Sequence, residues 1–286
     1  MAFFFAVSAA ASWGVAMTVA KPGARHLDPV TFLLARWALA LVLAALVGLA
    51  GGGLVVPTWR TAGLVVLGSL LNAVVGWTLY LLAMRRSPAY QVTALASTAP
   101  LWGVLGAILF VGEPFRWVAL VAALLVVAGA YFLVGGRWRD VRATSTGSLL
   151  AITAGILWGV SETVPMNLAT RHGIPAPTAI VVFACAAIGG LILLTPLLRR
   201  HLPRRVDRPG LALAGVSAVF GAFLGWWLWL SGLRLAPASV LAPVRGSTLL
   251  FTFLFSILFL GERPTRPAIV GVALVFGGVL LVSLGT

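Results

Sequence analysis

Long apolar runs separated by short breaks with Arg, Pro or Gly are the feature that most constrains this fold. A helix of about 20 apolar residues crosses a hydrocarbon core of roughly 30 Å, and such runs recur along the chain. The 286 residues are 61% hydrophobic and only 9% charged, which leaves too little polar surface to cover a water-soluble globule. The sequence therefore predicts an all-α integral membrane protein.

The apolar runs predict ten transmembrane helices, with ends uncertain by several residues. The expected spans are residues 3–20, 30–49, 63–83, 90–110, 117–134, 147–168, 176–195, 211–230, 238–259 and 267–285. The segment Met1–Ala10 lacks a basic region before its apolar run, so it does not resemble a cleavable secretory signal. We expect it to be retained as part of the first span.

Basic residues are concentrated in the breaks and account for the formal net charge of +14. Fourteen of them follow odd-numbered spans: Lys21, Arg25, Arg85, Arg86, Arg137, Arg139, Arg142, Arg199, Arg200, Arg204, Arg205, Arg208, Arg263 and Arg266. The opposite face has four, Arg60, Arg116, Arg171 and Arg234. The positive-inside rule then predicts a cell (inner) membrane protein with both termini outside the cytoplasm. Topology thus explains the charge, and we expect no nucleic-acid partner.

An internal repeat divides the chain into two halves, residues 1–140 and 147–286. At an offset of 149 residues the repeated pairs are Gly76-Trp77 and Gly225-Trp226, Arg85 and Arg234, Pro88-Ala89 and Pro237-Ala238, Gly112-Glu113 and Gly261-Glu262, and Gly129 and Gly278. At an offset of 145, Trp13-Gly14-Val15 recurs as Trp158-Gly159-Val160. Five spans per half is an odd number, so we expect the second half to be inverted in the membrane.

Inverted repeats are typical of secondary transporters, because exchanging the conformations of the two halves converts an inward-open state into an outward-open one. The repeat therefore favours a transporter that works by alternating access. A channel remains an alternative, since inverted repeats occur in channels too.

Several short motifs mark the helices of the two halves, and two kinds of them, Trp-Gly and Gly-Glu, occur in both. They are Ser12-Trp13-Gly14, Leu157-Trp158-Gly159, Ala35-Arg36-Trp37, Pro100, Gly112-Glu113 and Gly261-Glu262. With these motifs, nearly the whole chain resembles the ten-helix EamA-type transporters of the drug/metabolite transporter (DMT) superfamily. The resemblance implies export of amino acids or related small metabolites through a central cavity between the halves. A membrane protein that handles a carrier lipid is the alternative from another class.

The halves depart from each other at positions that matter for chemistry. Leu249 stands where the counterpart of Pro100 would fall, and Phe183 where that of Arg36 would fall. Met17 is the repeat counterpart of Glu162. We therefore expect the two halves to be chemically unequal.

Three charged residues lie inside predicted spans, where a charge is costly unless it faces a cavity or a partner. Glu162 could accept a proton, bind a substrate ammonium, or neutralise an arginine. Arg36 and Arg245 could each bind an acidic substrate group through the planar guanidinium fork. For Arg36 the alternative is a structural pair or a snorkelling side chain.

Aromatic residues in the spans could line a pocket for apolar substrates, although packing is the alternative for each. The substrate-binding candidates are Trp13, Trp77, Tyr80, Trp102, Trp158 and Trp226. We assign Trp59, Trp117, Trp138 and Trp229 to the aromatic belts at the membrane interfaces. Helix-loosening residues, Gly76, Pro100, Gly225 and Gly246, are the expected hinges.

The Gly112-Glu113-Pro114 motif and its counterpart, residues 261–264, read as local helix punctuation. Glycine would end one helix, the acid would lie near the positive N-terminus of the next, and proline would occupy its first turn. The sequence contains no metal-ligand constellation and no nucleotide-binding glycine loop, so we expect no cofactor and no enzyme activity. The expected partners are a small-molecule substrate, the lipid bilayer and, as an open question, protons.

Overall fold

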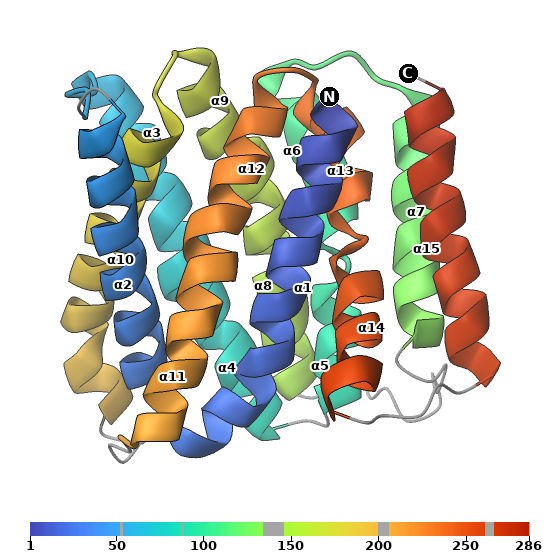
Figure 1. Ribbon diagram of the computed structural model, residues 1–286. Coiled ribbons are helices and arrows are strands. Elements are labelled where there is room, and N and C mark those ends of the chain that lie inside the picture. The colour runs from blue at the N-terminus through green and yellow to red at the C-terminus, as the bar shows by residue number, and fades with distance from the viewer. Residues whose placement is uncertain (52–53, 87–88, 134–145, 200–205, 261–265, 286) are drawn as a thin grey trace.

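A computed structural model describes residues 1–286 except 52–53, 87–88, 134–145, 200–205, 261–265 and 286. Within these residues the secondary structure is entirely helical (Figure 1). Eight helical stretches are long and apolar enough to cross a membrane, and two shorter apolar helices, Ala99–Val111 and Trp117–Leu133, bring the number to ten. The prediction of an all-α membrane fold with ten spans is confirmed.

The first five spans are built from eight helical segments. These are α1 (Ala2–His26), α2 (Pro29–Ala50), α3 (Trp59–Ser69), η1 (Leu70–Gly76), α4 (Trp77–Arg86), α5 (Ala89–Ala96), α6 (Ala99–Val111) and α7 (Trp117–Leu133). Asp28 caps the start of α2, where its carboxylate accepts a hydrogen bond from the backbone N–H of Thr31 at 3.1 Å, which satisfies a free donor of the first turn.

The last five spans are divided in the same way, except that the sixth span is also broken, between α8 and α9. Their segments are α8 (Thr146–Thr163), α9 (Pro165–Arg171), α10 (Ala176–Arg199), α11 (Arg208–Ser217), η3 (Ala218–Leu224), α12 (Gly225–Leu233), α13 (Ala238–Arg245), α14 (Thr248–Leu260) and α15 (Arg266–Leu284). The predicted boundary between the halves, after residue 140 and before residue 147, falls almost wholly outside the described residues.

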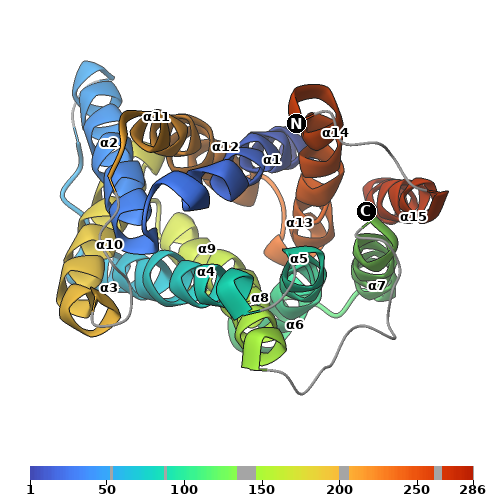
Figure 2. The ribbon, with the colours of Figure 1, turned by 90° about the horizontal axis from the view of Figure 1, so that it is seen from below.

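The two halves have opposite orientations. Both termini lie on the same face of the molecule (Figure 1), so α1 begins at this face and, five spans later, α8 begins at the opposite one. Helices of one half pack mainly against helices of the other: α1 against α11, α12 and α14, α8 against α4, η1 and α6, α2 against α10, and α7 against α15 (Figure 2). The helix contacts that hold the fold together are therefore mainly contacts between the two halves.

Small residues allow the closest of these approaches. In the pair α7–α15, a Cβ atom on Gly129 would lie 2.7 Å from the carbonyl oxygen of Gly271, and one on Gly278 would lie 2.8 Å from that of Ala122. Close backbone approach at small residues stabilises helix pairs in lipid, where the hydrophobic effect does not drive their association. This packing gives a physical reason for the repeated glycine at positions 129 and 278.

The third and eighth spans each contain a π-helical segment, η1 and η3. The first residue after each segment, Trp77 and Gly225, donates its backbone N–H to the carbonyl five residues earlier, that of Asn72 and Phe220. A π-helical bulge exposes backbone carbonyls that a regular α-helix would use, and it is frequent at functional sites. The repeat thus extends to an irregularity in the middle of these two spans.

Candidate functional site

Trp158 of α8 packs against η1 in the opposite half. Its indole Nε1 donates a hydrogen bond to the carbonyl of Asn72 at 3.3 Å, and its ring lies 5.3 Å from that of Trp77 and 5.0 Å from that of Tyr80, centroid to centroid. A Cβ atom on Gly76 would be 2.8 Å from Trp158 Nε1. The glycine therefore provides the space that the indole occupies.

Trp13 of α1 makes the equivalent contacts with η3 and α12. Its Nε1 donates to the carbonyl of Gly221 at 3.0 Å, and its ring lies 6.0 Å from Trp226 and 5.8 Å from Trp229. A Cβ atom on Gly225 would be 2.5 Å from Trp13 Nε1. Each half thus sends one tryptophan to a carbonyl of the other half's π-helix.

The assignment of Trp229 to the interfacial belt is wrong. Trp229 is only 1% exposed, because it packs on Trp13 as Tyr80 packs on Trp158. The offset of 149 residues relates Tyr80 to Trp229 and is the sequence signal that could have placed it in the interior. Trp59 and Trp117 are 88% and 70% exposed, and Trp138 lies outside the described residues.

Glu162 forms a buried ion pair with Arg245. The Glu162 side chain is 4% exposed, and its Oε2 and Oε1 accept hydrogen bonds from Arg245 Nε at 2.6 Å and Nη2 at 2.9 Å. The amide of Asn72 donates to Oε1 at 3.2 Å. The guanidinium carbon of Arg245 lies 5.4 Å and 5.9 Å from the rings of Trp13 and Trp158. The carboxylate therefore neutralises an arginine held between the two repeated tryptophans.

Arg36 has a different environment, because it is buried without a carboxylate. It is 2% exposed, so it does not snorkel, and it makes no ion pair with an acid among the described residues. Its guanidinium carbon lies 4.4 Å from the ring centroid of Trp77. Its Nε and Nη1 have no hydrogen-bond partner in the described part of the chain. A Cβ atom on Gly221 would be 2.9 Å from Arg36 Nη2, so the glycine makes room for this fork.

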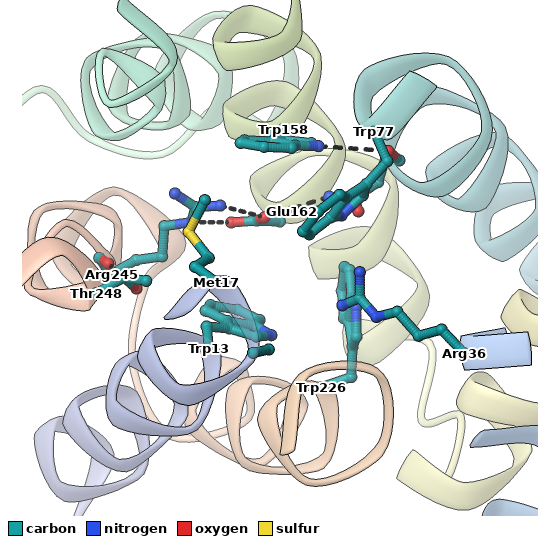
Figure 3. A pocket seen from close by; sticks show the side chains of 11 residues that line it. Trp13, Met17, Arg36, Trp77, Trp158, Glu162, Trp226, Arg245 and Thr248 are labelled. Carbon is teal, nitrogen blue, oxygen red and sulfur yellow. Dashed lines mark hydrogen bonds and ion pairs between the residues drawn. The ribbon is translucent and has the colours of Figure 1, made fainter. Parts of the chain in front are cut away.

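These side chains surround a small cavity where the two halves meet (Figure 3). It is lined by Trp13, Ala16, Met17, Arg36, Asn72, Trp77, Trp158, Glu162, Trp226, Arg245 and Thr248. The centre of a water molecule can occupy a volume of about 30 Å3 within it. This is room for about two waters. A metabolite therefore requires the cavity to widen.

The structure brings seven of the nine predicted binding residues to this cavity. Tyr80 and Trp102 are not among the lining residues. The ring of Tyr80 packs on that of Trp158 at 5.0 Å, and Trp102 Nε1 donates to the hydroxyl of Thr98 at 3.1 Å. Sequence reasoning missed four lining residues: Ala16, Met17, Asn72 and Thr248. For Asn72, a polar amide within an apolar run was the available signal.

The predicted hinge residues all lie at breaks in the spans. Gly76 ends η1 and Gly225 follows η3. Pro100 lies in the first turn of α6, directly after the break from α5, and Gly246 lies between α13 and α14. Pro100 and Gly246 also line a second cavity of about 20 Å3 beside the first. Two broken spans therefore meet next to the charged cavity.

The interpretation of Glu113 as punctuation for the next helix is wrong. Gly112 does end α6, in the left-handed conformation with φ 74°. However, the Glu113 carboxylate accepts backbone hydrogen bonds from Ala238 at 3.0 Å and Ser239 at 2.8 Å, at the start of α13 in the other half. It also accepts from Arg171 Nη2 at 2.6 Å. The motif therefore joins the halves on the face that contains the termini.

The rest of this motif also differs from the expectation. Pro114 precedes α7, which begins at Trp117, and so lies outside its first turn. Burial opposes ionisation of Glu113, but hydrogen bonds from Ser239, Ala238 and Asn167 outweigh it and lower the pKa of the carboxyl. The second copy of the motif, residues 261–264, lies outside the described residues.

Comparison with known proteins decides the family. The model of the EamA-like transporter family matches residues 1–135 and again residues 145–284. This chain belongs to that family. A crystal structure has the same fold as this chain: it is similar over 100% of this chain and 99% of its own, with a TM-score of 0.81 at 19% sequence identity.

Named relatives of this EamA-like chain include transporters. A riboflavin transporter of Rhizobium johnstonii is 31% identical over 78% of this chain and 70% of its own length. A probable terminal-alkyne amino-acid exporter of Streptantibioticus cattleyicolor is 26% identical over 70% of this chain and 65% of its own. Protein PecM of Dickeya dadantii is 26% identical over 79% and 73%. This EamA-like protein is therefore a multi-pass membrane transporter for a small molecule.

Proposed function

We propose that the protein is a secondary transporter that exports amino acids or related small metabolites by alternating access of its halves, residues 1–140 and 147–286. The observation that carries this proposal is the position of the cavity: side chains from both halves line it, and inverted elements meet around it. A site shared by two inverted halves can be exposed to either side in turn as the halves rock. The amino-acid exporter among the relatives supports the substrate class.

The breaks in the spans support the mechanism. Five spans are interrupted near the cavity, by η1, by η3, between α5 and α6, between α8 and α9, and between α13 and α14. We propose that Gly76, Pro100, Gly225 and Gly246 act as hinges there, because a few residues at element ends absorb most of a closing motion. The tightly packed cavity is then an occluded state, and substrate enters after one set of segments moves.

Counterflow in proteoliposomes tests this proposal. Vesicles with purified protein are loaded with one unlabelled compound, and uptake of its labelled form is followed for riboflavin and for neutral, aromatic, acidic and basic amino acids. Transient accumulation that depends on the internal compound supports a carrier and identifies its substrate. Arg60→Gln, at an exposed position outside the cavity, should transport normally. Flux without saturation or counterflow would contradict the proposal in favour of a channel, and no flux of any compound would favour the lipid-handling alternative.

Membrane orientation forms part of the same proposal. We place the protein in the inner membrane with its termini outside, because the opposite face has the arginine-rich loops. Val56 is 91% exposed in the α2–α3 loop on the face of the termini. In a Cys185→Ala background, Val56→Cys should react with a membrane-impermeant thiol reagent added to spheroplasts. Protection of Val56→Cys until the cells are lysed would contradict this orientation.

A further inference from the structure

The strongest unused feature of the cavity is the free fork of Arg36. This side chain is 98% buried in α2, and two of its nitrogens, Nε and Nη1, lack hydrogen-bond partners among the described residues. In Figure 3 it extends from α2 into the cavity toward Trp77 and Trp226. Contact with an aromatic face stabilises a guanidinium, yet it leaves the N–H donors unused, and unsatisfied buried donors are costly.

The charges around the cavity do not balance. Two arginines and one acid line it, and Glu162 is already bound by Arg245 through two hydrogen bonds of 2.6 Å and 2.9 Å. No further carboxylate belongs to the lining, so the site has one excess positive charge. Glu162 is equally unavailable to a substrate ammonium while Arg245 holds it. The missing group is therefore an anion. A carboxylate fits this role, because Nη2 together with either Nε or Nη1 presents two parallel N–H bonds to one carboxylate.

The walls beside Arg36 indicate what the anion is attached to. Trp13, Trp77 and Trp226 present aromatic surface to the cavity, and Met17 adds a flexible apolar side chain. Flat rings bind well against such surfaces, and methionine adapts to their outline. An inorganic anion would leave these walls without a contact.

We propose that the transported substrate is a planar, apolar carboxylate whose carboxyl group binds the fork of Arg36 while its ring lies among Trp13, Trp77 and Trp226. The inference rests on the proposed function, because it assumes that this cavity binds what the protein transports. It narrows the substrate class, since it requires a carboxylate and does not require an amino group.

A matched pair of ligands tests the inference. The probes are 3-phenylpropionate and its neutral amide, 3-phenylpropionamide, which have nearly the same shape and differ in charge. Counterflow and quenching of tryptophan fluorescence are measured for both, with chloride and inorganic phosphate as competitors. We expect the wild type to prefer the carboxylate by about tenfold or more, because the amide has no charge and places an NH2 donor where the carboxylate has its second acceptor oxygen. We also expect phenylalanine to gain nothing over 3-phenylpropionate from its ammonium.

Variants connect this preference to Arg36. Arg36→Gln should reduce the preference for the carboxylate to near unity, and Arg36→Lys, which keeps the charge without the fork, should reduce it several-fold. Arg60→Gln should retain the full preference. Size-exclusion profiles identify a variant that fails to fold, in which case Arg36→Lys and the wild-type ligand pair decide the outcome.

The outcomes separate this inference from the proposed function. Wild-type counterflow that is indifferent to the carboxylate, or a preference that survives in Arg36→Gln, would overturn the inference and leave the carrier intact. Equally effective competition by chloride or phosphate would overturn the requirement for a planar organic group. Absence of counterflow with these probes and with every compound of the amino-acid and riboflavin panel would instead contradict the proposed function.

Discussion

The two halves of the molecule share a scaffold but not a chemistry. Trp13 and Trp158 each donate to a carbonyl in the π-helix of the opposite half, at 3.0 Å and 3.3 Å. Around this symmetric frame the charged residues have no charged counterpart in the other half: Glu162 corresponds to Met17, and Arg36 to Phe183. The repeat therefore preserves the tryptophans that hold the helices together, while the charged residues of the cavity have no charged counterpart in the other half.

The carbonyl acceptors show how this divergence is accommodated. In the first half the acceptor residue is Asn72, and its side-chain amide turns to Glu162 at 3.2 Å. In the second half it is Gly221, and the space that a side chain would fill is taken by Ala16 and by Nη2 of Arg36. Each π-helix thus presents its carbonyl to a tryptophan and lies beside one charged residue, acidic at one site and basic at the other.

The largest expected effect comes from removing the charge of Glu162, which has no counterpart in the first half. Glu162→Gln leaves the mostly buried Arg245 without its counter-charge, and we expect a loss of about 3 kcal/mol or more in the free energy of unfolding, together with loss of counterflow. Thermal unfolding in detergent measures the first effect. The double variant Glu162→Gln/Arg245→Gln should recover much of the stability.

The corresponding change in the first half provides the control. Met17→Leu conserves volume at the repeat counterpart of Glu162, so we expect it to cost less than about 1.5 kcal/mol. If Glu162→Gln were as stable as Met17→Leu, the ion pair would not be the main chemical difference between the halves.

An intermediate effect should come from the symmetric frame itself. In Gly76→Ala and Gly225→Ala the new methyl group would overlap Trp158 Nε1 and Trp13 Nε1, at 2.8 Å and 2.5 Å. We expect both variants to lose about 1–3 kcal/mol through overpacking, with losses of similar size in thermal unfolding.

Gly63→Ala is the matched control for this pair, because it lies in the same span as Gly76 and its Cβ would have no neighbour within 4 Å. Alanine favours a helix over glycine by about 1 kcal/mol, so this variant should be slightly stabilised. A tolerated change at only one of Gly76 and Gly225 would show that the two tryptophan contacts are not equivalent.

The smallest expected effect concerns Glu113, which joins the halves outside the cavity. Glu113→Gln weakens the cap of α13 and the pair with Arg171, and we expect a loss of about 1–2 kcal/mol near neutral pH. The pKa of Glu113 lies below its ordinary value of 4.5, so its stabilisation is complete above that value and is lost as the pH falls through the lower, folded-state pKa.

Thermal unfolding of wild type and Glu113→Gln at about pH 7 and at successively lower pH tests this dependence. The difference between the two proteins should shrink as the pH falls below 4.5. A difference that stays constant would contradict the role of the ionised carboxylate. The variant Glu262→Gln then extends the comparison to the second copy of the motif, where the repeat predicts a loss of similar size.

The sequence alone determined the membrane fold, the number of spans, the inverted repeat and most of the residues around the cavity. These features can be recognised in the sequence itself. The length of an apolar run indicates a span, and the recurrence of Trp, Gly and Arg at a fixed offset indicates a duplication. Arg36, Glu162 and Arg245 could be chosen as site residues for the same reason, since a charge inside an apolar run requires a partner or a cavity.

Only the tertiary structure decided which of these groups meet. Arg245 lies 83 residues from Glu162 and Ala238 lies 125 from Glu113, and no local pattern specifies such pairings. Each π-helix rotates the residues that follow it to a different side of the span than a regular α-helix would. The roles of Asn72 and Trp229 could therefore not be inferred from regular helical spacing. Packing of the inverted halves pairs Glu162 with Arg245 and leaves Arg36 without a carboxylate, because the only acid among the described residues that lines the cavity lies against Arg245.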